Sequence, residues 1–214
     1  MNYRVVLFGG TFDPVHNGHL IAARAVAEQR RYGGITLVPS ARGPHKGPAG
    51  ASDADRLEML RLAVEGDDLF EISEVELRRA APSYTYDTLH EIGRGGSNDI
   101  DLVVGADMLA DMPNWYRADD VVRMARIIVA ARPPWHEKVA EITEELSERF
   151  GRRRADEMLD GMCVTPLVDI SSSDIRSRIE AGLSVRYMVP DAVLRHIESR
   201  GLYNFDKSTG PVDG

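Results

Sequence analysis

The chain has 214 residues, 43% hydrophobic and 28% charged, a composition typical of a globular protein with a sizeable core. Its formal net charge of −8 disfavours a protein that binds long nucleic acid, because such proteins usually carry a basic surface. A small phosphorylated ligand stays compatible if local donors and a divalent cation offset the charge. No apolar run is long enough to span a membrane, no signal peptide is expected, and the predicted compartment is the cytoplasm. The single cysteine, Cys163, excludes an intrachain disulfide and is expected in the core.

The first distinctive stretch lies near the start of the chain. Residues 5–8, Val-Val-Leu-Phe, have the length and β-branched content of a buried strand. Gly9 and Gly10 follow, and glycines let the backbone turn tightly and approach a ligand closely. From Leu20 the apolar pattern predicts a helix, with Asn17 as its expected N-cap. Strand, glycine turn and helix start together predict an anion site, most often for phosphate.

Two histidines lie at this helix start. His16 and His19 can both face the site and donate to phosphate oxygens. The alternatives are metal ligands or surface residues. A catalytic zinc would need a third protein ligand, for which only Asp13 and the distant His45 are candidates, so we predict no metal site here.

A Gly- and Pro-rich loop over residues 40–51 follows a second strand, predicted over 35–39. Its Lys46 could reach a phosphate as a mobile charge, or could simply be solvated. Ser52 begins a capping box before an amphipathic helix, and residues 70–75 alternate like a strand.

Ser83 or Thr85 is predicted to cap the next helix, which continues to Ile92. Its first N–H groups suit a carboxylate or phosphate, although a plain capped helix is an equally good interpretation.

A further strand is predicted over residues 99–105, followed by Asp107. An acid at the carboxyl end of a parallel strand can accept from a ribose hydroxyl, but Asp107 could equally cap the next helix. Trp115 and Tyr116 lie in a loop that contains Pro113, where aromatic rings can stack on a flat heterocycle or pack in the core.

The last two strands are predicted over residues 125–131 and 162–168. Between them residues 135–160 are charged and helical in pattern, which is typical of a solvated surface, and we assign no chemistry to them. A closing helix is predicted over 190–201, with Pro at its start and Gly at its end, and residues 204–214 are expected to form a flexible tail.

A second candidate phosphate site opens the helix before that closing helix. Ser171, Ser172 and Ser173 supply hydroxyls at the helix start, and Arg176 lies in its first turns. Hydroxyls, N–H groups and a guanidinium are suited to phosphate oxygens.

Six apolar strands alternating with helices predict an α/β fold, with a doubly wound, mostly parallel, Rossmann-like sheet and helices on both faces. We expect a single domain over residues 1–203. Ligands of such sheets bind beyond the carboxyl ends of the strands, where these motifs lie, so we predict one composite site. The absence of a Gly-x-Gly-x-x-Gly motif after the first strand disfavours a dehydrogenase.

Together the motifs resemble those of the bacterial nicotinate-nucleotide adenylyltransferases, which belong to the nucleotidyltransferase superfamily with the His-x-Gly-His motif. The resemblance covers residues 5–203 and is carried by GGTFDPVHNGHL at 9–20, PHK at 44–46, SYTYDTL at 83–89, GAD at 105–107, the Trp115 loop and ISSSDIR at 170–176. It implies that nicotinate mononucleotide and ATP, the latter with Mg²⁺, give nicotinate adenine dinucleotide and pyrophosphate in NAD biosynthesis. The implied reaction is a direct in-line attack without a covalent enzyme intermediate.

The resemblance also implies roles for individual residues. His19 would lie nearest the reacting phosphate, and Arg176 would grip the departing pyrophosphate. The implied catalytic residues are His16, His19, Lys46 and Arg176. The implied ATP-binding residues are Gly9, Gly10, Thr11, Phe12, His16, His19, Gly105, Asp107, Ile170, Ser171, Ser172, Ser173 and Arg176. The implied mononucleotide-binding residues are Lys46, Ser83, Tyr84, Thr85, Trp115, Tyr116 and Arg132.

The chain departs from the family pattern at two places. Ser173 stands where the family usually has threonine, a swap that should keep the hydroxyl contact. Residues 135–160 are longer and more charged than expected and could shape the entrance or a contact in a homo-oligomer. The alternatives are another superfamily adenylyltransferase, such as one acting on phosphopantetheine, and a catalytically silent nucleotide-binding module. The preference between nicotinate and nicotinamide stays open.

Overall fold

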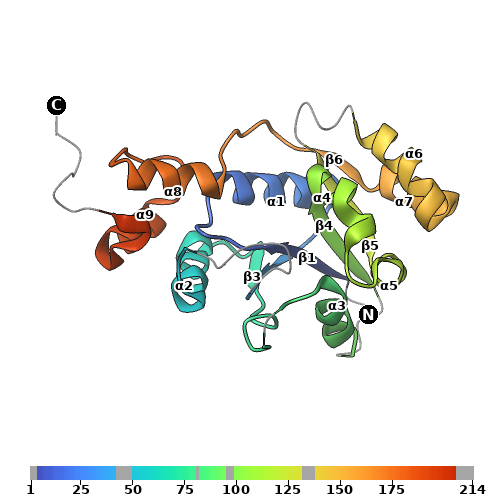
Figure 1. Cartoon of the computed structure of the whole chain (residues 1–214), viewed down its shortest axis with the longest axis horizontal. Helices are drawn as coiled ribbons and strands as arrows, with labels where there is room; N and C mark the ends of the chain where they lie inside the picture. The colour runs from blue at the N-terminus through green and yellow to red at the C-terminus, as the bar shows by residue number, and fades with distance from the viewer. Residues whose placement is uncertain (1–3, 42–49, 81, 95–98, 132–137, 206–214) are drawn as a thin grey trace.

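The computed structural model describes residues 4–41, 50–80, 82–94, 99–131 and 138–205. Within these ranges six strands form one sheet in the order β3-β2-β1-β4-β5-β6, and all neighbouring strands are parallel (Figure 1). The strands are β1 (Val5–Gly10), β2 (Ile35–Pro39), β3 (Phe70–Ile72), β4 (Ile100–Gly105), β5 (Arg126–Ala131) and β6 (Met162–Val164). The predicted parallel, doubly wound sheet is therefore confirmed.

Helices cover both faces of this sheet, with α1 and α8 on one side and α3 on the other (Figure 1). The α-helices are α1 (Asn17–Arg30), α2 (Asp53–Val64), α3 (Thr85–Arg94), α4 (Ala106–Asp111), α5 (Ala118–Met124), α6 (Val139–Phe150), α7 (Arg152–Asp160), α8 (Ser172–Glu180) and α9 (Asp191–Arg200). Short 3-10 helices cover Met112–Asn114 and Leu202–Asn204, so the second includes the first residue of the expected tail. Phe205 is also described, whereas residues 206–214 of that tail lie outside the described residues.

Side chains alternate along the central strands and divide the core into two layers. Val103 packs with residues of α1, α2, α8 and α9, whereas its neighbours Leu102 and Val104 pack with residues of α3 to α7. This alternation follows from the pleat of a strand, and burial on both faces explains the nearly continuous apolar runs. Cys163 is buried in the first layer, as predicted.

The strand order reverses direction between β1 and β4, the two strands at the centre of the sheet. Phe8 pairs with Val103, so Gly10 at the end of β1 lies beside the end of β4 at Gly105. In open parallel sheets such a switch point is where loops on the carboxyl side diverge and leave room for a ligand. The fold therefore places the predicted motifs of β1 and β4 at one location.

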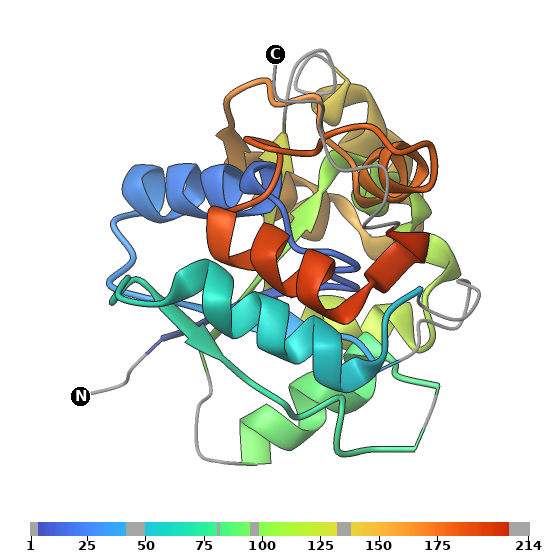
Figure 2. The ribbon, with the colours of Figure 1, turned by 90° about the vertical axis from the view of Figure 1, so that its left-hand side faces the viewer.

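Helices α2 and α9 lie side by side at one end of the molecule (Figure 2). Asp55 on α2 accepts hydrogen bonds from Arg200 Nε at 3.1 Å and forms a 3.2 Å contact with Nε2 of His196. Ser52 caps α2 by accepting from the Asp55 N–H at 3.1 Å, as the capping box predicts.

Several predicted element ends are wrong. β3 ends at Ile72 and β6 at Val164, because both are edge strands that pair on one side only. The N-cap of α1 is His16 rather than Asn17, which is already helical. The helix itself ends at Arg30, and Arg31 adopts the left-handed conformation that closes it.

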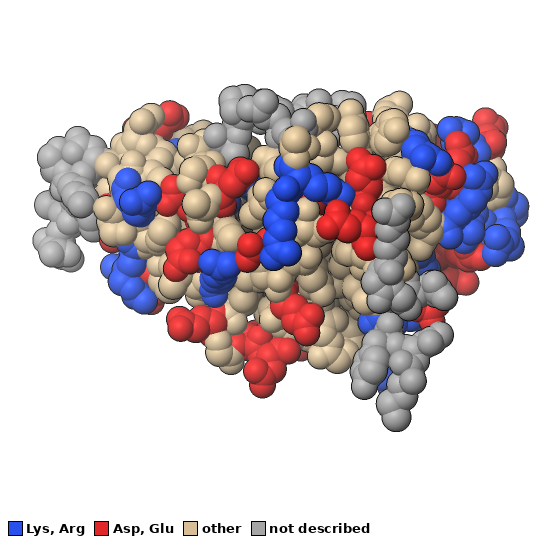
Figure 3. All heavy atoms as spheres, turned by 90° about the horizontal axis from the view of Figure 1, so that it is seen from below, with Lys and Arg blue, Asp and Glu red and all other residues tan. Residues whose placement is uncertain are grey.

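The charged segment predicted as a solvated surface forms α6 and α7, which pack against each other, α6 also against α4 and α7 against β5. Val139 and Leu146 are buried in the core, so one face of this segment is structural. On the other face basic and acidic side chains are interleaved at this end of the molecule (Figure 3), as in the 2.6 Å pair of Arg152 with Glu144. The segment is thus an amphipathic part of the fold.

Candidate active site

The turn after β1 is held from behind by buried side chains. Phe12 is buried in a left-handed conformation with φ +49°, and its ring packs beneath Gly10. A Cβ on Gly10 would lie 2.9 Å from that ring, which explains the requirement for glycine there. Arg56, on α2, is fully buried and donates to the Thr11 carbonyl oxygen at 2.5 Å. The packing of Phe12 and Arg56 therefore fixes the turn next to Gly9, which is exposed to solvent.

The two histidines lie face to face at the start of α1. Their ring centroids are 3.7 Å apart, with His16 buried and His19 partly exposed. The His16 N–H donates to Nδ1 of His19 at 3.3 Å, so a neutral His19 ring carries its proton on Nε2. A Cβ on Gly18 would lie 3.0 Å from Nδ1 of His16. The glycine of His-x-Gly-His thus makes room for the buried histidine ring.

Asp13 is the buried centre of this region. Its carboxylate accepts hydrogen bonds from the N–H groups of Gly50 at 2.6 Å and Ala51 at 3.1 Å, and from the Tyr203 hydroxyl at 2.7 Å. Burial and the neighbouring carboxylate raise the pKa of Tyr203, so its hydroxyl stays protonated and donates at neutral pH. Gly50 is the first described residue after the segment that contains Lys46. Asp13 therefore ties the turn after β1 to the exit of that segment and to the C-terminal part of the fold.

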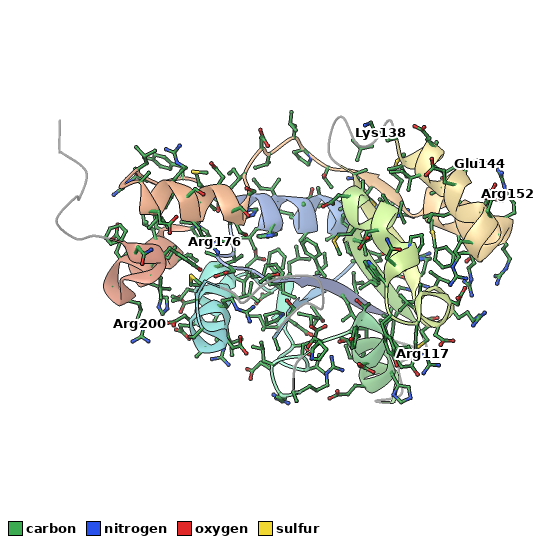
Figure 4. All side chains as sticks on the ribbon, viewed as in Figure 1. Arg117, Lys138, Glu144, Arg152, Arg176 and Arg200 are labelled. Carbon is green, nitrogen blue, oxygen red and sulfur yellow. The ribbon has the colours of Figure 1, made fainter. Side chains whose placement is uncertain are left out.

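The start of α8 is attached to the same turn. Ser172 Oγ donates to the Pro14 carbonyl oxygen at 2.9 Å, and Arg176 Nη1 donates to the Asp13 carbonyl oxygen at 2.7 Å. The guanidinium also lies 3.8 Å from the Asp13 carboxylate, on the side of α8 that faces α2 (Figure 4). The N-termini of α1 and α8 therefore open beside each other.

The serines that open α8 have different roles. Ser171 is the N-cap and accepts from the Asp174 N–H at 3.0 Å, whereas Ser173 is exposed and accepts from Arg176 Nη2 at 3.4 Å. Ile170, just before the cap, is half-buried. A capped helix start whose N–H groups point outward beside an arginine is suited to a phosphate group.

Gly105 and Asp107 lie at the end of β4, beside the end of β1. Gly105 is the N-cap of α4, so the alternative role of Asp107 as the cap is wrong. Asp107 is exposed in the first turn, and a Cβ on Gly105 would lie 2.5 Å from its Oδ1. The Asp107 carboxylate thus folds back over the strand end at the switch point.

The aromatic residues predicted near the mononucleotide come from two elements. Tyr84, just before α3, has its ring centroid 4.5 Å from that of Tyr116, which is half exposed. Thr85 is the first residue of α3, and the buried Ser83 precedes Tyr84, so neither occupies the cap position. Trp115 packs partly against the core, which leaves Tyr116 as the more exposed ring of the loop.

Two of the predicted site residues, Lys46 and Arg132, lie outside the described residues. No group of three or more His, Cys, Asp or Glu side chains that could hold a metal is found in the described part of the chain. Among the described residues, no helix is long and apolar enough to cross a membrane.

Comparison with known proteins places this geometry in a family. The model of the cytidylyltransferase-like family matches residues 7–178. A protein of Roseiflexus castenholzii, named a probable nicotinate-nucleotide adenylyltransferase, is 38% identical over 201 residues, covering 94% of this chain and 98% of the relative. The chain belongs to the nicotinate-nucleotide adenylyltransferase family. A second adenylyltransferase so named, from Marinobacter nauticus, is 37% identical over 98% of the chain and 99% of its own length.

A solved structure supports the fold of this adenylyltransferase family member. The nicotinic acid mononucleotide adenylyltransferase of Plasmodium falciparum, solved in complex with NaAD, superimposes with a TM-score of 0.74. The match covers 95% of this chain and 98% of the other at 16% identity, so it concerns the arrangement of the elements. Nucleotidyltransferases of this kind generally use a divalent metal.

Three residues that support the adenylyltransferase site escape a motif-based prediction. The sequence suggests no role for Asp13 beyond a possible metal ligand, Arg56 lies in a helix pattern, and Tyr203 is 190 positions from its partner Asp13. The pairing of Arg56 with Asp53, at 2.6 Å and three residues apart, is the one local signal among them. Long-range hydrogen bonds of this kind leave no periodic pattern in the sequence.

A further group of residues, hydrogen-bonded to one another, packs at the first turn of α3. Glu76 accepts from Thr88 Oγ1 at 2.7 Å, and Arg79 Nη2 contacts the same hydroxyl at 2.6 Å. Burial raises the pKa of Glu76, while the Thr88 hydrogen bond opposes the rise. This cluster holds the helix start that, by the family resemblance, is expected to receive the mononucleotide.

Proposed function

We propose that the chain joins nicotinate mononucleotide to the adenylyl group of ATP and releases pyrophosphate. The observation that carries this proposal is the attachment of α8 to the turn after β1, through Ser172 to Pro14 and Arg176 to Asp13. Two helix N-termini with their positive dipole ends then share one region, which suits a triphosphate better than a single phosphate.

The proposed chemistry requires position and positive potential rather than a nucleophilic side chain. The 5′-phosphate oxygen of the mononucleotide is already an anion, so it attacks the α-phosphorus of ATP without deprotonation by a base. The bond to the β-phosphate oxygen breaks in line, and the electron pair leaves with pyrophosphate. Catalysis then rests on donors aimed at the developing charge on the phosphoryl oxygens.

The described residues supply such donors. We infer that Nε2 of His19 donates near the reacting phosphate, because Nδ1 is held by the His16 N–H. The start of α8 and Arg176 would take the pyrophosphate end. The divalent cation enters as part of the substrate, which we infer to be the Mg²⁺ complex of ATP.

The mononucleotide is assigned to the other side of the switch point. The first N–H groups of α3, next to Tyr84 and Thr85, suit a carboxylate, and the exposed ring of Tyr116 suits a flat heterocycle. Lys46 and Arg132 remain in their predicted roles. We also infer one catalytic domain that acts in the cytoplasm and extends through the 3-10 helix Leu202–Asn204, one residue beyond the predicted boundary at 203, with the residues after it as a tail.

The test is a pyrophosphate-release assay with ATP and each of three acceptors. Nicotinate mononucleotide should be converted, nicotinamide mononucleotide measures the preference for the carboxylate, and phosphopantetheine represents the nearest alternative activity. Release with phosphopantetheine only, or no release with any acceptor, would refute the proposal. The latter result would favour a silent nucleotide-binding module.

A further inference from the structure

Arg117 connects the two segments assigned to the mononucleotide. It stands directly before α5 with φ +53° and ψ +42°, a left-handed conformation that costs energy for a residue other than glycine. Its guanidinium carbon lies 3.9 Å from the centroid of the Tyr86 ring, within the range of a cation–π contact. The Arg117 side chain thus lies beside α3 (Figure 4).

Both partners are sequence neighbours of the proposed binding residues. Tyr86 follows Thr85 in the first turn of α3, and Arg117 follows Tyr116. The rings of Tyr86 and Tyr116 are themselves in edge contact, with centroids 6.0 Å apart. The contact between Arg117 and Tyr86 therefore joins the Trp115–Tyr116 loop to α3, at the residues that directly follow the proposed binding residues.

The charge of Arg117 is largely balanced within α5. Its Nε donates to Asp120 Oδ2 at 2.6 Å, and the side chain is 46% exposed to solvent. Such a paired and solvated guanidinium projects little field toward a bound carboxylate. Its effect on the site should therefore come from geometry rather than from attraction to the substrate.

We propose that Arg117 is a positioning residue that sets the affinity for nicotinate mononucleotide. Its stacking on Tyr86 holds the Trp115–Tyr116 loop against the first turn of α3. The loop and the helix can then bind the pyridine ring and the carboxylate of the substrate at the same time. This inference rests on the proposed function. In the proposed function ATP binds at α1 and α8, which Arg117 does not contact. Loss of Arg117 should therefore change KM for the mononucleotide and not KM for ATP.

The experiment compares steady-state kinetics of the full chain with those of Arg117→Ala and Arg117→Lys. Arg117→Ala should raise KM for nicotinate mononucleotide by about three- to tenfold, the range expected from loss of one cation–π contact. KM for ATP should stay within about twofold by the same reasoning, because residues on the triphosphate side are untouched. Arg117→Lys should restore part of the loss, since it keeps the cation.

Two further variants separate this role from general damage. Tyr86→Leu should reproduce the effect, and adding Arg117→Ala to it should cause little further loss, because both remove one contact. Arg123→Ala is the matched control, since Arg123 also pairs with Asp120, at 3.2 Å, from the next turn of α5. It should leave both KM values unchanged.

The outcomes are distinct. Unchanged KM values in Arg117→Ala, or parallel rises for both substrates with a lowered melting temperature, would overturn the positioning role. If Arg117→Ala and Arg123→Ala raised KM for the mononucleotide equally, the effect would belong to their shared partner Asp120, and the positioning role would be overturned too. Failure of the unmodified chain to convert nicotinate mononucleotide would refute the proposed function itself, independently of these variants.

Discussion

At the residue scale, the His-x-Gly-His motif fixes how its own two histidine rings pack, in addition to its proposed role as a donor to phosphate. His16 is buried and stacked on His19, and the space for its ring exists because residue 18 has no Cβ. His19 is oriented in turn by the N–H of His16. One histidine therefore positions the other, and the residues of the motif depend on each other.

The first prediction concerns His19. His19→Ala should lower kcat by about a hundredfold or more, the range found when a donor to a developing charge is removed. A pyrophosphate-release assay under saturating substrates measures it, with circular dichroism to check that the variant folds. A kcat within threefold of the parent value would contradict the role of His19.

Gly18→Ala provides a second prediction. The new methyl group would press on the buried His16 ring at 3.0 Å, and the shift should pass to His19 through the stacked rings. We expect kcat/KM for ATP to fall by about tenfold or more, since a small misplacement at a reacting centre is costly. Gly93→Ala, at a helical glycine with open space around it, is the control and should retain full activity. Equal activities of both variants would refute the packing argument.

At the element scale, α8 and the C-terminal 3-10 helix act as a brace for the turn after β1. Arg176 and Ser172 hold the backbone of that turn from one side, and Tyr203 holds the Asp13 carboxylate from another. Elements from the two ends of the chain thus meet at one buried acid. The hydrogen bonds of the turn after β1 are therefore complete only when α8 and the segment around Tyr203 are in place.

Tyr203→Phe tests this brace. Removal of a hydroxyl that donates to a buried carboxylate should cost about 1.5–3 kcal/mol of unfolding free energy, the range for hydrogen bonds to charged groups. The melting temperature should fall by roughly 3–12 °C for a protein of this size. Tyr187→Phe is the control, because the Tyr187 side chain is 81% exposed. Thermal unfolding of both variants gives the comparison, and equal shifts would exclude the proposed brace.

At the scale of the whole molecule, α9 is held against α2 by the cluster around Asp55. The hydrogen bond from Ser52 is the largest cause that lowers the pKa of Asp55, followed by the contacts with Arg200 and His196. A carboxyl whose pKa is lower in the folded than in the unfolded chain stabilises the fold above its unfolded pKa. That stabilisation disappears as pH falls through the folded pKa.

Asp55→Asn should therefore destabilise the chain in a pH-dependent way. We expect a loss of about 1–2 kcal/mol at pH 7, as for broken hydrogen bonds to a charged group near a helix cap. The difference from the parent should narrow below about pH 4, the ordinary pKa range of aspartate. Urea unfolding at pH 7 and pH 3 measures it, with Glu65→Gln, at the exposed residue that follows the opposite end of α2, as control. A difference that stays constant with pH would exclude the linkage.

The sequence predicted the six strands, a mostly parallel doubly wound sheet with a switch point, and the family, and it located the two helix starts that we propose as the site. These features have local signals, since apolar runs, turn glycines and capping serines each occupy a few neighbouring positions. Edge-strand ends at Ile72 and Val164 were missed, because pairing partners and not propensity decide where an edge strand stops.

Tertiary structure alone decided how those parts are held together. Asp13 and Tyr203 lie 190 positions apart, and Arg176 meets the Asp13 carbonyl oxygen across 163. Likewise, the Arg117 stacking on Tyr86 depends on how α3 and α5 pack. A local pattern records what each residue does to its neighbours in the chain, whereas a hydrogen bond between distant segments exists only after the core has brought them together.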